Sequence, residues 1–252
     1  MRIKIDFETS GVMDVPYRQF ENLQGLVMSL LSKYDNINWL HNEGTREKRV
    51  YKPLCYSHFI GNRKALKHNW RYFGNFSLYI SSPMPAIIFS IEKLLKERSY
   101  FRFCNKTIVS INYEIIDTEN VKSHTFSTLS PIVCSTPITL TSGKIYQKFL
   151  DAFDIDFSRI LQDNLKNKAK AFYNLELNGK FEIIPEFDKS EVISKFHLYN
   201  YKNSVIKAMS GRYKINADSN YLYVANNCGL GSRNALGFGL INIIGDNSNA
   251  EN

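Results

Sequence analysis

Residues 228–240 read CGLGSRNALGFGL, in which four glycines have the spacing G-x-G-x5-G-x-G. Glycines in such a cluster adopt positive φ angles at low cost and let another backbone approach closely. Backbone N–H groups there can surround phosphate oxygens, and Arg233 adds a fixed positive charge. The segment therefore predicts a phosphate-binding loop; a glycine-rich tight turn that binds nothing is the alternative.

Two well-known glycine motifs do not account for this segment. A dinucleotide-binding fingerprint requires glycine at the position of Asn234 and opens a strand–helix unit, whereas this loop closes one. A nucleoside-triphosphate loop requires Gly-Lys followed by Ser or Thr, which the segment lacks.

The first half of the chain alternates between strand-like and helix-like hydrophobic patterns. Residues 2–7 alternate polar and apolar side chains, and apolar residues from Phe20 to Tyr34 recur every three or four positions, as on an amphipathic helix. The resulting order, strand–helix–strand–strand–helix–strand, is typical of a ferredoxin-like domain. We expect a strand at 2–7, a helix at 20–34, a helical turn at 37–41, strands at 50–60 and 71–81, a helix introduced by Pro83 and Pro85, and strand structure within 100–116.

The second half gives the same order. We expect a strand at 125–134, a long helical stripe from Tyr146 to Leu161 with Asp151, Asp154 and Asp156 on its polar side, strands at 180–187 and 191–214, a helix at 218–227 and a strand at 236–244. The fold class predicted is thus α+β, with tandem ferredoxin-like (RRM-like) domains at 1–120 and 121–245. Residues 246–252 form a polar tail.

Composition excludes several classes of protein. The chain has 252 residues and a net charge of +8, and contains no run of about 18 apolar residues that would predict a membrane span. Its N-terminus lacks the apolar segment of a signal peptide. Four cysteines without a C-x-x-C pair disfavour a thiolate zinc site and a disulfide framework, and fit a reducing cytoplasm.

Much of the positive charge lies in one window, residues 46–71. This window also contains Tyr51, Tyr56, Phe59 and Trp70, and Tyr72 follows it directly. Basic residues among aromatic ones can bind phosphates and present stacking surfaces to unpaired bases. A solvated face with aromatic residues in the core is the alternative. The basic residues of the window are Arg46, Lys48, Arg49, Lys52, Arg63, Lys64, Lys67 and Arg71, against Glu47 as the one acidic residue.

With these motifs, nearly the whole chain resembles the RAMP superfamily of CRISPR systems, and within it the sixth CRISPR-associated (Cas) protein family. The glycine loop marks the superfamily. Four further blocks narrow the resemblance to the nucleases that process precursor CRISPR RNA: 23–27 (LQGLV), 40–44 (LHNEG), 52–57 (KPLCYS) and 126–133 (FSTLSPIV).

The resemblance implies metal-independent RNA cleavage. In that reaction a ribose 2′-hydroxyl attacks the adjacent phosphorus and leaves a 2′,3′-cyclic phosphate and a 5′-hydroxyl end. It needs proton transfer at two oxygens and a cation near the phosphorane. No metal or other cofactor is expected, and the partner is precursor CRISPR repeat RNA. Further effector-complex subunits and a second copy of the chain remain open as partners.

His41 occupies the position of the family's catalytic histidine, and its unperturbed pKa of about 6.5 suits an acid or a base. Lys52 matches the active-site lysine. Met28 stands where some members carry a tyrosine, and a thioether cannot exchange a proton. The base is therefore left open between Lys52, a second histidine and water, or His41 serves alone in a slow enzyme. A protein that binds RNA without cutting it is the alternative function.

The remaining candidate residues are expected to bind RNA. They are the four glycines Gly229, Gly231, Gly237 and Gly239, and the cations Lys48, Arg49, Arg63, Lys64, Lys67, Arg212, Lys214 and Arg233.

Overall fold

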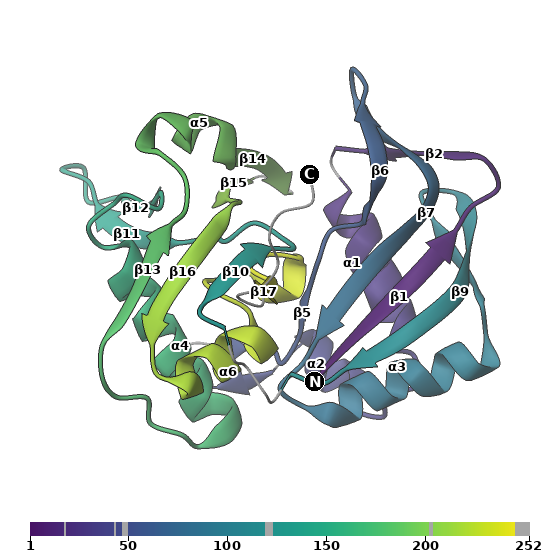
Figure 1. The fold of residues 1–252 in the computed structure, drawn as a ribbon, viewed down its shortest axis with the longest axis horizontal. Coiled ribbons are helices and arrows are strands. Elements are labelled where there is room, and N and C mark those ends of the chain that lie inside the picture. Colours follow the sequence, from purple (N-terminus) through teal and green to yellow (C-terminus); the bar gives the residue numbers. More distant parts are fainter. Residues whose placement is uncertain (18, 43, 47–49, 119–122, 202–203, 245–252) are drawn as a thin grey trace.

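The computed structural model describes residues 1–244 except 18, 43, 47–49, 119–122 and 202–203, and the side chains of 41, 42 and 46. The tail predicted at 246–252 lies outside these residues. The chain forms a mixed α and β structure with antiparallel sheets (Figure 1). Of the helices in the described ranges, none has the length and apolar character needed to cross a membrane.

The first sheet is built from the first half of the chain. Its central strand β1 lies between β7 and β9 and is antiparallel to both. The sheet order is β2-β7-β1-β9-β8, and β5 and β6 also pair with β7. These strands are β1 (Arg2–Glu8), β2 (Val12–Pro16), β5 (Cys55–Tyr56), β6 (Ile60–Ala65), β7 (Asn69–Ser81), β8 (Tyr100–Phe103) and β9 (Lys106–Ile116).

Helices α1 (Phe20–Leu30) and α3 (Pro85–Glu97) contribute apolar stripes to one core with the inward residues of this sheet. A short helix α2 (Ile37–Asn42) and a small hairpin of β3 (Thr45–Arg46) and β4 (Val50–Tyr51) follow α1. The prediction of one strand over 50–60 is wrong. Pro53 has no N–H to donate to a sheet, and Leu54 N–H instead donates to the carbonyl of Lys52, which turns the chain between β4 and β5.

The second sheet is built from the second half and has the order β13-β16-β10-β17. Helices α4 (Phe157–Tyr173) and α6 (Ser219–Cys228) share a core with it. Its strands are β10 (Thr125–Thr128), β13 (Phe181–Pro185), β16 (Arg212–Ala217) and β17 (Ile241–Ile244). Two hairpins stand apart from it, β11 (Ser135–Thr139) with β12 (Ile145–Phe149), and β14 (Phe196–Tyr201) with β15 (Ser204–Met209).

The long helix predicted to start at Tyr146 begins at Phe157 instead. Residues 145–149 are strand β12, and the acidic cluster forms the turn before the helix rather than its polar side. Asp154 accepts a hydrogen bond from Asp151 N–H, and Asp151 accepts one from Phe153 N–H. These side-chain contacts compete with helical hydrogen bonding and favour a turn.

Three other predicted strands are shorter than expected. The strand at 125–134 ends at Thr128, the region 191–214 begins with a short helix α5 (Val192–Lys195), and the last strand begins at Ile241 after a 3₁₀ turn η2 (Asn234–Leu236). Apolar residues in these segments pack in loops, which hydrophobic pattern alone does not distinguish from strands.

The two sheets lie side by side with the glycine-rich segment between them, and β17 is an edge strand of the second sheet (Figure 1). A small core of buried residues from both halves joins them, in which the rings of Phe20 and Phe238 stack 5.1 Å apart. The buried guanidinium of Arg2 donates hydrogen bonds of 2.8 Å to the backbone and side-chain oxygens of Asn226. The two halves are therefore joined by apolar packing and by buried hydrogen bonds.

Candidate active site

The glycine-rich loop runs from Gly229, after α6, to Leu240, before β17. Leu230 N–H donates to the Gly239 carbonyl, and the side chain of Asn234 donates to the carbonyls of Leu230 and Phe238. At Gly231 and Gly239, φ is positive, and an added Cβ would collide with the carbonyl oxygens of Val133 and Leu230 respectively. These two glycines are therefore required by close backbone packing.

Residues 55–58, from the first half of the chain, support the loop. The Cys55 thiol donates to the carbonyl of Phe238, and the Tyr56 hydroxyl donates to the carbonyl of Ala235 at 3.1 Å. The Ser130 hydroxyl donates to the Tyr56 carbonyl and accepts from Leu240 N–H. The loop is thereby held against the segment that carries Lys52.

Lys168, on α4, supports the loop from the other side. Its side chain is buried, and Nζ donates to the carbonyl oxygens of Gly229 at 2.8 Å and Gly231 at 2.9 Å. Burial lowers the Lys168 pKa to about 8, although the nearby Cys228 and Cys55 thiols oppose that shift. Sequence reasoning missed this residue because a lysine on an amphipathic helix normally lies in solvent.

A pocket of about 460 Å³ lies where these elements meet, and we call it the cation pocket because Lys52, Lys168 and Arg233 line it. Burial lowers the pKa of Lys52 and of Arg233, and Tyr201 opposes the shift at Arg233. Gln24 of α1 also lines the pocket, as do Gly231 and Ser232 of the loop. Three cationic residues that line one small volume, partly shielded from water, suit the binding of a phosphate group.

Of the predicted catalytic residues, Lys52 lies in this pocket and His41 belongs to the last turn of α2. The side chain of His41 lies outside the described residues. Gly44, three residues later, packs its backbone against Tyr51 and Lys52, with an added Cβ 3.3 Å from Lys52 Cγ. The chain after α2 is therefore adjacent to Lys52. Met28 lies one helical turn after Gln24 and is partly buried against the first core.

The residues predicted to bind RNA fall into separate groups. Gly231 and Arg233 line the cation pocket, whereas Gly229, Gly237 and Gly239 are buried in the packing of the loop. Lys48 and Arg49 lie outside the described residues.

Arg63 lines a different cleft of about 730 Å³, together with His58 and His197, and its guanidinium lies 4.3 Å from the Trp70 ring centroid. Burial lowers the His58 pKa to about 4, so this imidazole is neutral at pH 7.

Four predicted RNA-binding cations line none of these pockets. Lys64 and Lys67 are exposed on and after β6. Arg212 and Lys214 are exposed on β16, where Arg212 pairs with Glu186 at 2.7 Å.

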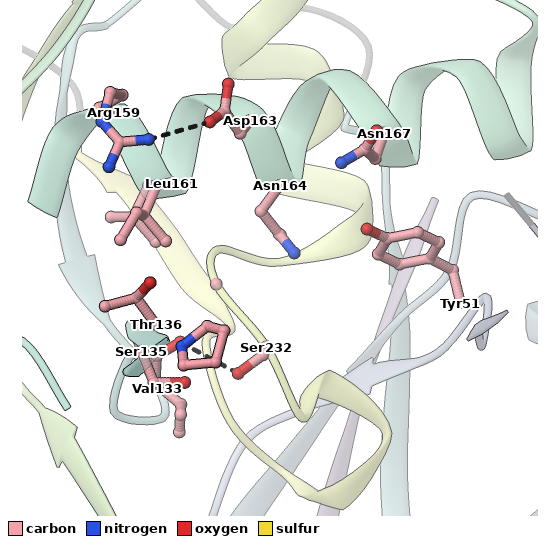
Figure 2. Close-up of a pocket in the computed structure, with 13 residues that line it drawn as sticks. Tyr51, Val133, Ser135, Thr136, Arg159, Leu161, Asp163, Asn164, Asn167 and Ser232 are labelled. Atoms are coloured by element: carbon pink, nitrogen blue, oxygen red, sulfur yellow. Dashed lines mark hydrogen bonds and ion pairs between the residues drawn. The ribbon is translucent and has the colours of Figure 1, made fainter. Parts of the chain in front are cut away.

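A second pocket of about 260 Å³ adjoins the cation pocket and is shown in Figure 2. It is lined by Asn164 and Asn167 of α4, and we call it the amide pocket. It was not predicted, because isolated asparagines on a helix carry no sequence signal. Among the described residues, no group of three or more His, Cys, Asp or Glu side chains could hold a metal ion.

Comparison with known proteins places this geometry in context. A sequence profile for "CRISPR associated protein Cas6, C-terminal" matches residues 115–243. CRISPR-associated endoribonucleases Cas6 1 and Cas6 2 of Methanocaldococcus jannaschii are 24% and 26% identical to the chain, over 96% and 97% of it and 92% and 100% of their own lengths. CRISPR-associated endoribonuclease Cas6 of Pyrococcus furiosus is 22% identical over 94% of the chain and 86% of its own length.

Solved structures agree in fold. The product of a Cas6-related gene from Pyrococcus furiosus superposes with a TM-score of 0.82 at 19% identity, covering 98% of this chain and 99% of that one. A RAMP protein described as binding different RNA substrates gives a TM-score of 0.80 at 19% identity, covering 97% of this chain and all of that one.

Proposed function

This chain belongs to the Cas6 family of CRISPR-associated proteins, and from that premise we propose that it is an endoribonuclease that cleaves CRISPR repeat RNA. The observation that carries the proposal is the cation pocket. Lys52 from the first half of the chain, and Lys168 and Arg233 from the second half, face one volume beside the glycine-rich loop. An RNA phosphate bound there would contact both halves of the molecule.

The proposed reaction is an internal phosphoryl transfer. The ribose 2′-oxygen attacks the adjacent phosphorus and loses its proton, and the bond from phosphorus to the 5′-oxygen of the next nucleotide breaks. The products are a 2′,3′-cyclic phosphate and a 5′-hydroxyl. Lys52 and Arg233 hold the nonbridging oxygens and offset the charge that develops on them, which is the effect that fixed cations in a shielded site supply.

We assign the proton transfer at the leaving 5′-oxygen to His41. This role follows from the family resemblance and from the position of His41 at the end of α2, just before the segment that packs on Lys52. With Met28 at the position of the family's tyrosine and the Lys52 ammonium on the phosphate, we assign acceptance of the 2′-proton to a water molecule that acts as the base.

A second candidate function is RNA binding without cleavage, as a RAMP subunit of an effector complex. Met28 favours this function. It lies one helical turn from Gln24, which lines the cation pocket, and its thioether cannot exchange the proton that cleavage requires.

We also infer that the chain consists of two ferredoxin-like halves, at 1–120 and 121–245. This is supported by β1, which lies between β7 and β9, and by β10, which lies in the same way between β16 and β17. In each half, two helices share one hydrophobic core with the sheet.

The test is cleavage of a labelled CRISPR repeat RNA in single turnover, with and without EDTA, followed by analysis of the product ends. A cyclic phosphate formed at one position in EDTA supports the proposal. The His41→Ala variant should cleave about 10²- to 10⁴-fold more slowly with nearly unchanged RNA affinity. Tight binding with no product in any buffer would establish the second function, and full activity of His41→Ala would overturn the assignment of that residue.

A further inference from the structure

The amide pocket adjoins the cation pocket, because Tyr51, Asn164, Gly231 and Ser232 line both. Its walls come from α4, from Val133 and the start of β11, from Tyr51 of β4, and from the glycine-rich loop (Figure 2). A nucleotide whose phosphate occupies the cation pocket can therefore extend into the amide pocket without leaving the protein surface.

The charge of the amide pocket differs from that of its neighbour. Arg159 is the one cation among the residues that line it, and its guanidinium is paired with Asp156 at 2.8 Å and with Asp163 at 3.5 Å. Asp163 itself lines the pocket and would repel a phosphate. The pocket is thus suited to a neutral polar group.

Asn164 has a hydrogen-bonding atom available for such a group. Its side chain projects from α4 toward the glycine-rich loop (Figure 2), and Oδ1 is buried without a hydrogen-bond partner among the described residues. A buried polar atom with no partner is costly, and such atoms are rare in native proteins. A ligand that donates a hydrogen bond to Asn164 would remove that cost.

We propose that the amide pocket binds one unpaired nucleobase of the substrate RNA, adenine in preference to the other bases, beside the phosphate in the cation pocket. This inference rests on the proposed function. A carboxamide presents an acceptor and a donor side by side. Its oxygen can accept a hydrogen bond from the N6 amino group of adenine, and its nitrogen can donate one to N7 or N1. Tyr51 adds an aromatic wall to the pocket, and Asn167, one turn after Asn164, adds a second amide.

The consequence is a fixed cleavage register. The base in the amide pocket determines which phosphate enters the cation pocket. The chain therefore cuts the RNA beside the nucleotide whose base that pocket binds.

The test measures kcat/KM for seven repeat RNAs: the natural repeat, and six variants in which each of the other three bases replaces the nucleotide on one side or the other of the cleaved bond. At one of the two positions, adenine should be preferred by about 5- to 150-fold, the range that a bidentate amide–base pair provides. Asn164→Leu, similar in size but without hydrogen-bonding atoms, should abolish most of that preference. Asn216→Leu, at an exposed position of β16 outside both pockets, is the matched control and should retain it.

A second measurement adds a change in the RNA that can be tested on the wild-type protein alone. Purine riboside, which lacks the N6 amino group, should slow the wild-type protein about as much as Asn164→Leu slows cleavage of the adenine RNA. The two changes together should cost little more than either alone, because they remove the same contact. Additive effects would overturn the inference, as would an adenine preference that survives in Asn164→Leu. Absence of cleavage in all seven RNAs would instead count against the proposed function.

Discussion

The ammonium nitrogen of Lys168 lies 2.9 Å from the carbonyl oxygen of Gly231, inside the protein and at the wall of the cation pocket. The same nitrogen holds the carbonyl of Gly229 at 2.8 Å. Two glycine carbonyls of the loop therefore turn inward toward one buried charge, and the conformation of the loop depends on it.

Replacing Lys168 with methionine should slow repeat-RNA cleavage. The change removes hydrogen bonds from a charged donor and leaves two buried carbonyls unpaired, an effect of about 1.5–3 kcal/mol, or roughly 10- to 150-fold if it is expressed in the rate. Single-turnover cleavage measures it, with Lys166→Met as the control, since Lys166 lines neither the cation pocket nor the amide pocket. Wild-type rates in Lys168→Met would show that the loop does not need this charge.

The same lysine should make stability depend on pH. Its pKa is about 8 in the folded protein and about 10.5 when unfolded, so the unfolded chain binds more protons between those values. Stability from this group therefore rises as pH increases from about 8 to 10.5, by about 3 kcal/mol at most. Denaturant unfolding gives the free energy of unfolding of wild type and of Lys168→Met at each pH in this range. The difference between the two proteins removes the contribution of tyrosines and cysteines, which titrate in both. A difference that does not change with pH would contradict the burial of a charged Lys168.

Two glycine substitutions should have opposite effects on stability. Gly239→Ala places a Cβ against the Leu230 carbonyl at a positive φ, so we expect a loss of several kcal/mol. Gly25 lies within α1 with open space around its Cβ position, so Gly25→Ala should stabilise the protein by up to about 1 kcal/mol. Urea unfolding compares the two variants, and equal effects would contradict the packing of the loop.

Local patterns predicted the elements that have a clear period and strong end signals. The helix that starts at Pro85 and the strand that ends at Ser81 lie where their residues indicate. The helix expected from Tyr146 failed because apolar residues of a hairpin happened to continue the helical spacing, while Asp151 and Asp154 formed a turn through their own side chains.

The candidate site was predictable only in part, because local sequence patterns do not encode contacts between distant segments. Lys52 and Arg233 carry charge in recognisable motifs, and the structure brings them to one pocket. Lys168 and Asn164 are ordinary helix residues in sequence, and their importance arises from the approach of α4 to the glycine-rich loop, a long-range contact that no local pattern encodes.

Removing the side chain of Lys52 or of Arg233 should reduce the salt dependence of RNA binding. Each lysine or arginine that contacts a phosphate of single-stranded RNA releases counterions, which contributes about 0.7 to the slope of log K against log salt. We therefore expect Lys52→Ala and Arg233→Ala to lower the slope by about that amount.

Binding is measured with a repeat RNA carrying a 2′-deoxy nucleotide at the cleaved position, so that affinity is separated from chemistry. Lys180→Ala is the control, because Lys180 is paired with Glu182 and lines none of the pockets. A slope that is the same in all three variants and in the wild type would mean that the phosphate is bound elsewhere, since a cation cannot hold a phosphate without displacing the ions around it.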